Sequence, residues 1–124
     1  MIIVQEGALC FTVPIVQADG ALEIKSVIAK SYLCISSRFH GAASALGSAV
    51  PCLATGWSHK YEEIFKDYGL DASYLLKDGY PMNPRIGELL SEDGNAAMRE
   101  RLSRRIPDLK ELTEEMWDTV WSIL

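Results

Sequence analysis

The sequence lacks several features, and each absence excludes a class of protein. No apolar run in its 124 residues is long enough to cross a bilayer, and no basic segment precedes the apolar amino terminus as in a signal peptide. Net positive charge is lacking too: the formal charge of −5 disfavours broad electrostatic binding to nucleic acid or to an anionic membrane. The glycine motifs that bind nucleotide phosphates are also missing. We therefore expect a cytoplasmic protein whose anion sites, if any, are local.

Cysteine and histidine are scarce. The three cysteines, Cys10, Cys34 and Cys52, are widely spaced and odd in number, which argues against a disulfide framework. Together with two histidines they lack the spacing of metal ligands, so we expect no metal site and no cofactor. A nucleophilic pair of Cys34 and His40 is disfavoured because Cys34 lies in an apolar run. We expect Cys34 and Cys52 to be small buried residues.

The pattern of apolar runs predicts a single α/β domain over residues 1–124. Strands are predicted at 12–17, 31–36, 52–56 and 72–76, and helices from Asp19 to about Lys30, over 41–50 and over about 59–68. Alternating strands and helices predict a three-layer, Rossmann-like parallel sheet with helices on both faces. Three or four strands are few for a complete domain of this kind, so we expect one half of a larger protein.

The carboxyl end of the chain predicts a long helical segment. Apolar residues recur every three or four positions from Met98 to Val120. Pro107 is predicted to kink or split this helix, because proline removes a hydrogen-bond donor. Trp117 and Trp121 widen the apolar stripe, which is more typical of core or interface than of a cofactor site.

Two turns contain both histidines of this acidic chain, together with one arginine and one lysine. The segments SRFHG (37–41) and SHK (58–60) each follow a predicted strand and open a predicted helix. If these strands are neighbours, the turns share the carboxyl edge of the sheet, where ligands bind. Helix amino termini hold phosphate or carboxylate. Arg38 and Lys60 would add positive charge, and His40 can transfer a proton near neutral pH.

Simpler interpretations of these residues remain open. An Arg-x-His sequence after a strand is often a surface turn, and Lys60 and His59 at a helix start are often solvated. The pair Glu62-Glu63 is typical of a solvated helix face. The coincidence of two such turns still favours a small anion site. Its candidate residues are Ser37, Arg38, His40, Gly41, Ser58 and Lys60, with His40 as the catalytic residue.

The segment 36–70, SSRFHGAASALGSAVPCLATGWSHKYEEIFKDYGL, resembles the polysaccharide pyruvyl transferase family. The resemblance consists of an R-x-H-G turn, a small-residue helix broken by proline, an apolar strand, a lysine-bearing turn and a helix that ends in Gly-Leu. Looser similarity extends from about Asp19 to about Trp121. The ordered combination carries the resemblance, since R-x-H-G alone would be unspecific.

The resemblance implies the carboxy-terminal half of a two-domain transferase of the GT-B type. Family members move the enolpyruvyl carbons of phosphoenolpyruvate onto a sugar hydroxyl of a cell-surface polysaccharide or its lipid-linked precursor. Arg38 and His40 match the family's R-x-H that contacts phosphoenolpyruvate, and Lys60 matches its lysine. The implied setting is exopolysaccharide biosynthesis in the bacterial cytoplasm or at the inner face of the membrane.

This sequence departs from the family pattern at its amino end. Full-length members carry a further half with additional basic contacts to phosphoenolpyruvate. We therefore expect weak or absent activity from this chain alone, and either a missing amino-terminal half or a homodimer. Two alternatives are the nucleotide-sugar-binding half of a GT-B glycosyltransferase and a non-catalytic module that docks through its Trp-bearing helix.

Overall fold

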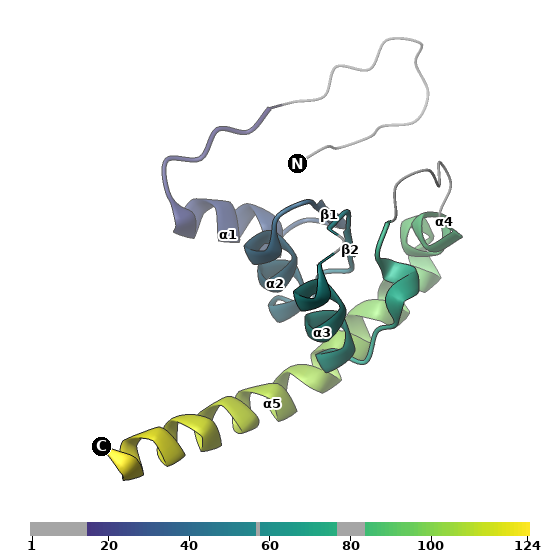
Figure 1. Cartoon of the computed structure of the whole chain (residues 1–124). Coiled ribbons are helices and arrows are strands. Elements are labelled where there is room, and N and C mark those ends of the chain that lie inside the picture. The colour runs from purple at the N-terminus through teal and green to yellow at the C-terminus, as the bar shows by residue number, and fades with distance from the viewer. Residues whose placement is uncertain (1–14, 57, 77–83) are drawn as a thin grey trace, which may run out of the picture.

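The computed structural model describes residues 15–56, 58–76 and 84–124. The described elements are α1 (Ala21–Ala29), β1 (Cys34–Ser36), α2 (Phe39–Gly47), β2 (Cys52–Ala54), α3 (His59–Asp67), the 3-10 helix η1 (Ala72–Tyr74), α4 (Pro84–Leu90) and α5 (Glu92–Ile123). Figure 1 shows most of these elements gathered around the two short strands, while α5 runs past them and projects at its carboxyl end.

The predicted three-layer, Rossmann-like sheet is wrong. Within the described residues the sheet has two strands, β1 and β2, which pair in parallel with Cys34 opposite Cys52. Helices account for 68% of the described residues. The expected likeness to the carboxy-terminal half of a GT-B fold depended on the larger sheet and is therefore wrong as well.

Local interactions explain why the sheet stays small. The Asp71 side chain accepts a hydrogen bond from the Ser73 N–H at 2.8 Å, which turns the fourth predicted strand into η1. Beyond η1, Leu75 makes only a single parallel bridge to β2. The other predicted strand, 12–17, lies partly outside the described residues. Its described part forms no strand, and Ile15 is 87% exposed.

The unit β1–α2–β2 is the part of the predicted α/β pattern that forms. The helix between the strands begins at Phe39, two residues earlier than predicted, and buries Ala42, Ala45 and Leu46. Small residues allow α2 to approach the strands closely. The chain leaves α2 through Ala49, which has a φ of 56°, and then enters β2 through the buried Pro51.

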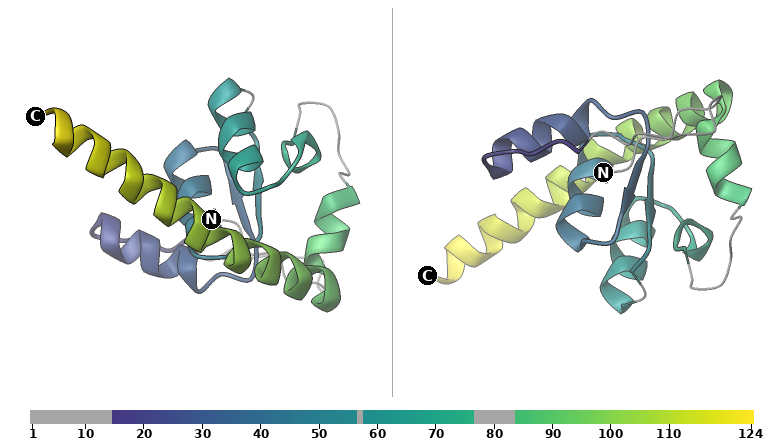
Figure 2. Two further views of the ribbon diagram at one scale, coloured as in Figure 1. Left: turned by 90° about the horizontal axis from the view of Figure 1, so that it is seen from below. Right: turned by 90° about the horizontal axis from the view of Figure 1, so that it is seen from above.

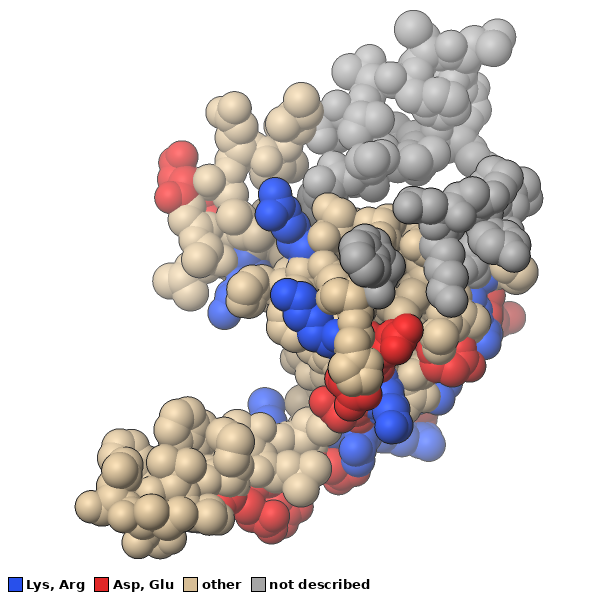
Figure 3. Space-filling view, viewed as in Figure 1, with Lys and Arg blue, Asp and Glu red and all other residues tan. Residues whose placement is uncertain are grey.

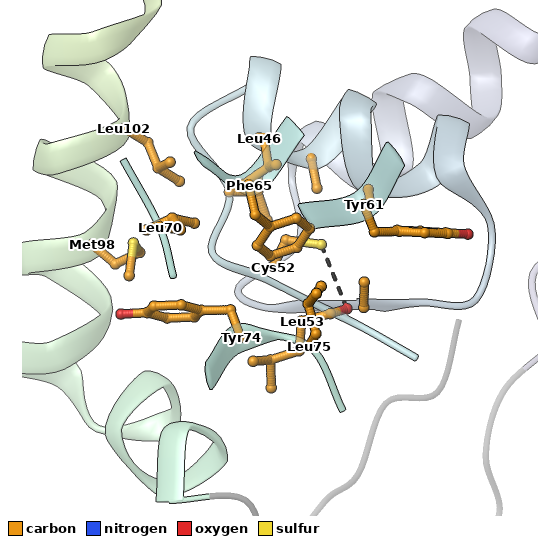
Figure 4. Packing of buried hydrophobic residues seen from close by; sticks show 14 of the residues in the cluster. Leu46, Cys52, Leu53, Tyr61, Phe65, Leu70, Tyr74, Leu75, Met98 and Leu102 are labelled. Carbon is orange, nitrogen blue, oxygen red and sulfur yellow. Dashed lines mark hydrogen bonds between the residues drawn. The ribbon is translucent and has the colours of Figure 1, made fainter. Parts of the chain in front are cut away.

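The core lies where α2, α3, β2 and α5 meet. Phe65 of α3 is 1% exposed, and Figure 4 shows it beside Leu46 and Cys52 in the buried cluster. The end of α3 matches its prediction: Gly69 has a φ of 74°, and the Leu70 N–H donates to the Phe65 carbonyl at 2.8 Å. This turn directs the chain back toward the core, where Leu70 is buried.

Helix α5 is anchored to the rest of the molecule through its first three turns. Its buried residues are Asn95, Met98 and Leu102, and Figure 4 shows Met98 and Leu102 on the α5 side of the core. The Asn95 Nδ2 donates to the carbonyls of Tyr32 at 2.9 Å and Leu89 at 3.0 Å. Both views in Figure 2 show that the helix then leaves the body.

The prediction that Pro107 splits the long helix is wrong. The helix runs without interruption from Glu92 to Ile123 with Pro107 inside it. A proline removes one hydrogen bond to the carbonyl four residues earlier. Ser103 and Pro107 are both exposed, so water can solvate the carbonyl that loses its partner. The cost of the proline is therefore small enough for the helix to continue.

Candidate functional site

The two predicted turns do lie at the same edge of the sheet. The last residues of the strands, Ser36 and Ala54, are opposite one another in the parallel register. The pairing continues one step further, because the Thr55 N–H donates to the Ser36 carbonyl at 3.0 Å. The turn that opens α2 and the turn that opens α3 are therefore neighbours at the carboxyl ends of β1 and β2, as the sequence predicted.

The turn into α2 is shaped by Ser36. Its Oγ accepts from the Arg38 N–H at 3.1 Å and donates to the Arg38 carbonyl at 2.9 Å. A Cβ on Gly41 would lie 2.5 Å from the same Oγ, so glycine is required for this packing. Arg38 is the N-cap of α2, and no side chain of the described residues caps it. The sequence reasoning named Gly41 for backbone approach to a ligand and missed Ser36.

The turn into α3 has Ser58 at its N-cap position. Its side chain makes no capping hydrogen bond, and its Oγ is buried without a hydrogen-bond partner among the described residues. Burying a hydroxyl without a partner is unfavourable. Like α2, helix α3 therefore begins without a side-chain cap within the described part of the chain, which leaves first-turn N–H groups for an anion.

Tyr61 joins the two turns. Its ring is buried, and its hydroxyl donates to the Ser37 carbonyl at 2.9 Å, so α3 is tied directly to the turn that opens α2. A Cβ on Gly56 would lie 2.3 Å from the Tyr61 ring, which explains the glycine before α3. Tyr61 lies in the helix that the sequence predicts over about 59–68. An aromatic residue three positions after an N-cap gave no signal of this link.

An aromatic ring lies between two of the predicted ligand residues. The Phe39 ring contacts both the His40 ring and the Tyr61 ring, each at 5.8 Å between centroids and in edge-on geometry. The Lys60 Nζ lies 5.5 Å from the Phe39 ring centroid, within the range of a cation–π interaction. Phe39 thus links His40 on α2 to Lys60 on α3.

Arg38, His40 and Lys60 are all exposed at this edge. Figure 3 shows basic side chains over α2 and α3 on one face of the molecule. His59 is also exposed and lies 3.6 Å from carboxylate oxygens of both Glu62 and Glu63, on its own helix. His59 is thereby directed toward acidic neighbours, whereas no carboxylate in the described part of the chain forms an ion pair with His40, which favours His40 as the histidine of an anion site.

A hollow of about 400 Å³ lies beside His40, between α1 and α2. It is lined by Lys25, His40, Ala43, Ser44, Gly47 and Ser48. The sequence did not indicate Lys25, because the face that α1 turns toward α2 depends on tertiary packing. The hollow places one further cation near His40.

Cys34 and Cys52 lie opposite one another at the start of the two strands, whereas the two turns follow the ends of the strands. A hydrogen bond with Cys52 lowers the pKa of the Cys34 thiol, against the opposing effect of burial. The same bond and burial raise the pKa of Cys52 well above its ordinary value. Both thiols are free; Cys52 is buried, as expected, whereas Cys34 is only half-buried. Across the described ranges, no cluster of three metal-ligating side chains occurs.

Comparisons with known proteins leave the family open. No family model matches the chain, and neither does any curated protein or solved structure. In the described part of the chain, no helix combines the length and the apolar character that crossing a membrane requires.

Proposed function

We propose that the paired turns bind phosphoenolpyruvate and that the chain supplies the donor-binding part of a pyruvyltransferase. One observation supports the proposal. Helices α2 and α3 begin next to one another at the carboxyl edge of the parallel strands β1 and β2, and no described side chain caps either helix. Each start offers N–H groups and the positive end of a helix dipole. The hydrogen bond from Tyr61 to Ser37 holds the two starts together.

The charges at this edge fit a small molecule with two anionic groups. Phosphoenolpyruvate carries a phosphate and a carboxylate on adjacent atoms. The Arg38 guanidinium can bind a carboxylate through two parallel hydrogen bonds, whereas the Lys60 ammonium acts as a point charge for phosphate. The exposed Ser37 adds a hydroxyl group, whereas the Ser58 Oγ is buried and would contact a ligand only after the turn into α3 moves. The overall charge of −5 makes such a positive edge a local exception.

The proposed reaction joins phosphoenolpyruvate to two hydroxyls of a sugar. Both hydroxyl oxygens form bonds to C2 of the enolpyruvyl group, the bond from C2 to the phosphate oxygen breaks, and a pyruvate ketal results. One hydroxyl proton ends on the methylene carbon, which becomes a methyl group, and the other leaves with the phosphate. We assign a proton transfer to His40, since imidazole exchanges protons near neutral pH. In the presence of the part that supplies the acceptor site, full turnover by a His40→Gln variant would contradict this role.

The sugar acceptor is proposed to be part of a cell-surface polysaccharide or its precursor, modified at the cytoplasmic side. Among the described residues this edge is open, with Arg38, His40 and Lys60 exposed. Transfer chemistry depends on holding both reactants and excluding water. We therefore propose that the acceptor site and the remaining donor contacts come from an amino-terminal half or a separate subunit, and that the chain alone is weakly active or inactive.

Binding of phosphoenolpyruvate to the intact chain tests the proposal. In calorimetric titration at low salt, we expect Arg38→Ala to weaken binding by about 10-fold to 100-fold, because a charge-assisted hydrogen bond contributes roughly 1.5–3 kcal/mol. Lys66→Ala is the matched control, since Lys66 is exposed at the opposite end of α3. Equal losses in the two variants would show a general charge effect and contradict the assigned site.

A parallel titration with UDP separates the proposal from its nearest enzymatic alternative. A nucleotide-sugar transferase would bind UDP in preference to phosphoenolpyruvate. A chain that is folded by circular dichroism but binds neither ligand would support the remaining alternative, a non-catalytic interaction module.

A further inference from the structure

The last sixteen residues of the chain form an exposed helical arm. We define the α5 arm as residues 109–124, all but the last of which belong to α5. Trp117 is 51% exposed and Trp121 is 67% exposed, and the other exposed large apolar residues of the arm are Leu112, Met116, Val120, Ile123 and Leu124. Figures 1 and 3 show the arm projecting away from the body. An exposed apolar surface of this size marks a docking site.

The arm is amphipathic, with all of its acidic residues on one side. In a helix of 3.6 residues per turn, the positions 109, 112, 116, 120 and 123 fall along one stripe. Four acids lie on the opposite half of the helix: Glu111, Glu114, Glu115 and Asp118. An anionic membrane would repel this acidic half, whereas surface-binding helices are typically basic. The chemistry of the arm therefore favours a protein partner.

We propose that the partner is the arm of a second copy of this chain, packed antiparallel. The stripe residues are spaced symmetrically about Met116, with Leu112 and Val120 four positions away and Leu109 and Ile123 seven positions away. A two-fold axis beside Met116 places each of these residues at the level of its counterpart in the other copy. Interfaces with two-fold symmetry need this kind of self-complementarity. The acidic halves of both helices then face outward.

The same symmetry gives the remaining large side chains favourable neighbours. Trp117 is one residue from the centre, so the two Trp117 rings of a pair lie next to one another on the same side of the interface. Trp117 and Trp121 already lie together within one arm, with 6.5 Å between ring centroids. Lys110 falls one position from the level of Trp121 in the other copy, where its ammonium can contact the indole ring. Lys110 is the single basic residue of the arm.

The exposed area is sufficient for a stable pair. The arm is about 24 Å long at a rise of 1.5 Å per residue. The two partly exposed indoles can together bury roughly 200 Å², since an aromatic side chain buries about 150–250 Å² when fully covered. With the other exposed apolar side chains, the total is on the order of 800 Å² per copy, which is the contribution of each partner to a standard interface.

Sedimentation equilibrium of the intact chain tests this inference. We expect a reversible dimer and an increase of at least about 100-fold in the dissociation constant for Met116→Glu, because two charges would face one another at the apolar centre. Ser122→Glu is the matched control: it adds the same charge to the exposed arm but lies off the stripe. A monomer at all concentrations up to about 100 μM, or equal effects of the two variants, would overturn the proposal.

Cysteine cross-linking tests the antiparallel arrangement. In a background with Cys10 replaced by serine, Met116→Cys should give a disulfide-linked dimer on mild oxidation, and Leu109→Cys should not. A dimer linked efficiently through Leu109→Cys would show parallel helices and contradict the model. Binding of the chain to neutral phosphatidylcholine vesicles without any dimer would also overturn it, because the stripe would then face lipid.

Discussion

Replacing Phe65 by alanine is expected to lower the free energy of unfolding by about 3–5 kcal/mol, the usual range for truncation of a buried phenylalanine. Phe65 is 1% exposed and lies at the centre of the cluster in Figure 4. Its ring connects α3 to α2 and β2, so a cavity there cannot be filled by movement of a single side chain. Whole small domains are stable by only about 5–15 kcal/mol.

Urea denaturation followed by circular dichroism measures this loss. The control is Lys66→Ala at the next, exposed position of α3, which should change stability by less than about 0.5 kcal/mol. A loss of under about 1 kcal/mol for Phe65→Ala would mean that the described core does not hold the molecule together. The same variants should be assayed for ligand binding, since α3 also carries Lys60 and Tyr61.

Replacing Asn95 by alanine is the second change with a large expected effect, about 1–3 kcal/mol. Asn95 is 2% exposed, and its amide donates to the carbonyls of Tyr32 and Leu89. The Tyr32 carbonyl keeps a second donor, the Arg99 guanidinium at 3.1 Å, but the buried Leu89 carbonyl loses the amide, and a buried carbonyl without a donor costs roughly 1–3 kcal/mol. Its Oδ1 also accepts from Arg99 Nε at 2.9 Å, and the Arg99 guanidinium donates to the Ser31 carbonyl at 2.7 Å. This network fastens α5 to the segment that leads into β1.

Two measurements test this effect, which opposes the gain in helix propensity that alanine brings. Urea denaturation should show the loss for Asn95→Ala and little change for Ser103→Ala, an exposed position on the same helix. Limited digestion with trypsin should cut at Arg99 faster in Asn95→Ala, since release of α5 exposes that bond. Unchanged digestion and unchanged stability would show that the network does not anchor the helix.

The sequence predicted several local structures correctly because their causes are local. Helix α3 covers His59–Asp67, within one residue of the predicted range, and the turn that follows it passes through Gly69. The small-residue helix and the strands on either side of it also form, with β1 covering only the end of its predicted run. The prediction that the two turns would share an edge followed from this β–α–β unit.

The sheet and the long helix could not be predicted in the same way. Whether a short apolar run pairs as a strand depends on its neighbours, and a side chain at Asp71 was enough to turn one run into η1. Pro107 lies in an exposed helix, where solvent offsets the hydrogen bond that it removes. The pattern of apolar residues therefore missed a local side-chain effect at Asp71 and an effect of solvent exposure at Pro107.

The candidate site, too, could be predicted only in part from the sequence. Charged and histidine residues are visible in a sequence, whereas the groups that position them are ordinary polar residues and aromatics. Ser36 shapes one turn, Tyr61 ties the turns together, and Phe39 lies between His40 and Lys60. Nothing in their spacing distinguishes these three from residues of a plain surface turn or a core.

The most direct test of the central claim is an amide NMR titration of the intact chain with phosphoenolpyruvate. If both helix starts form one anion site, the backbone amides of Phe39 and His40 on α2 and of His59 and Lys60 on α3 should shift together. All four shifts should fit a single dissociation constant. Shifts confined to one turn, or different constants for the two turns, would contradict a shared site.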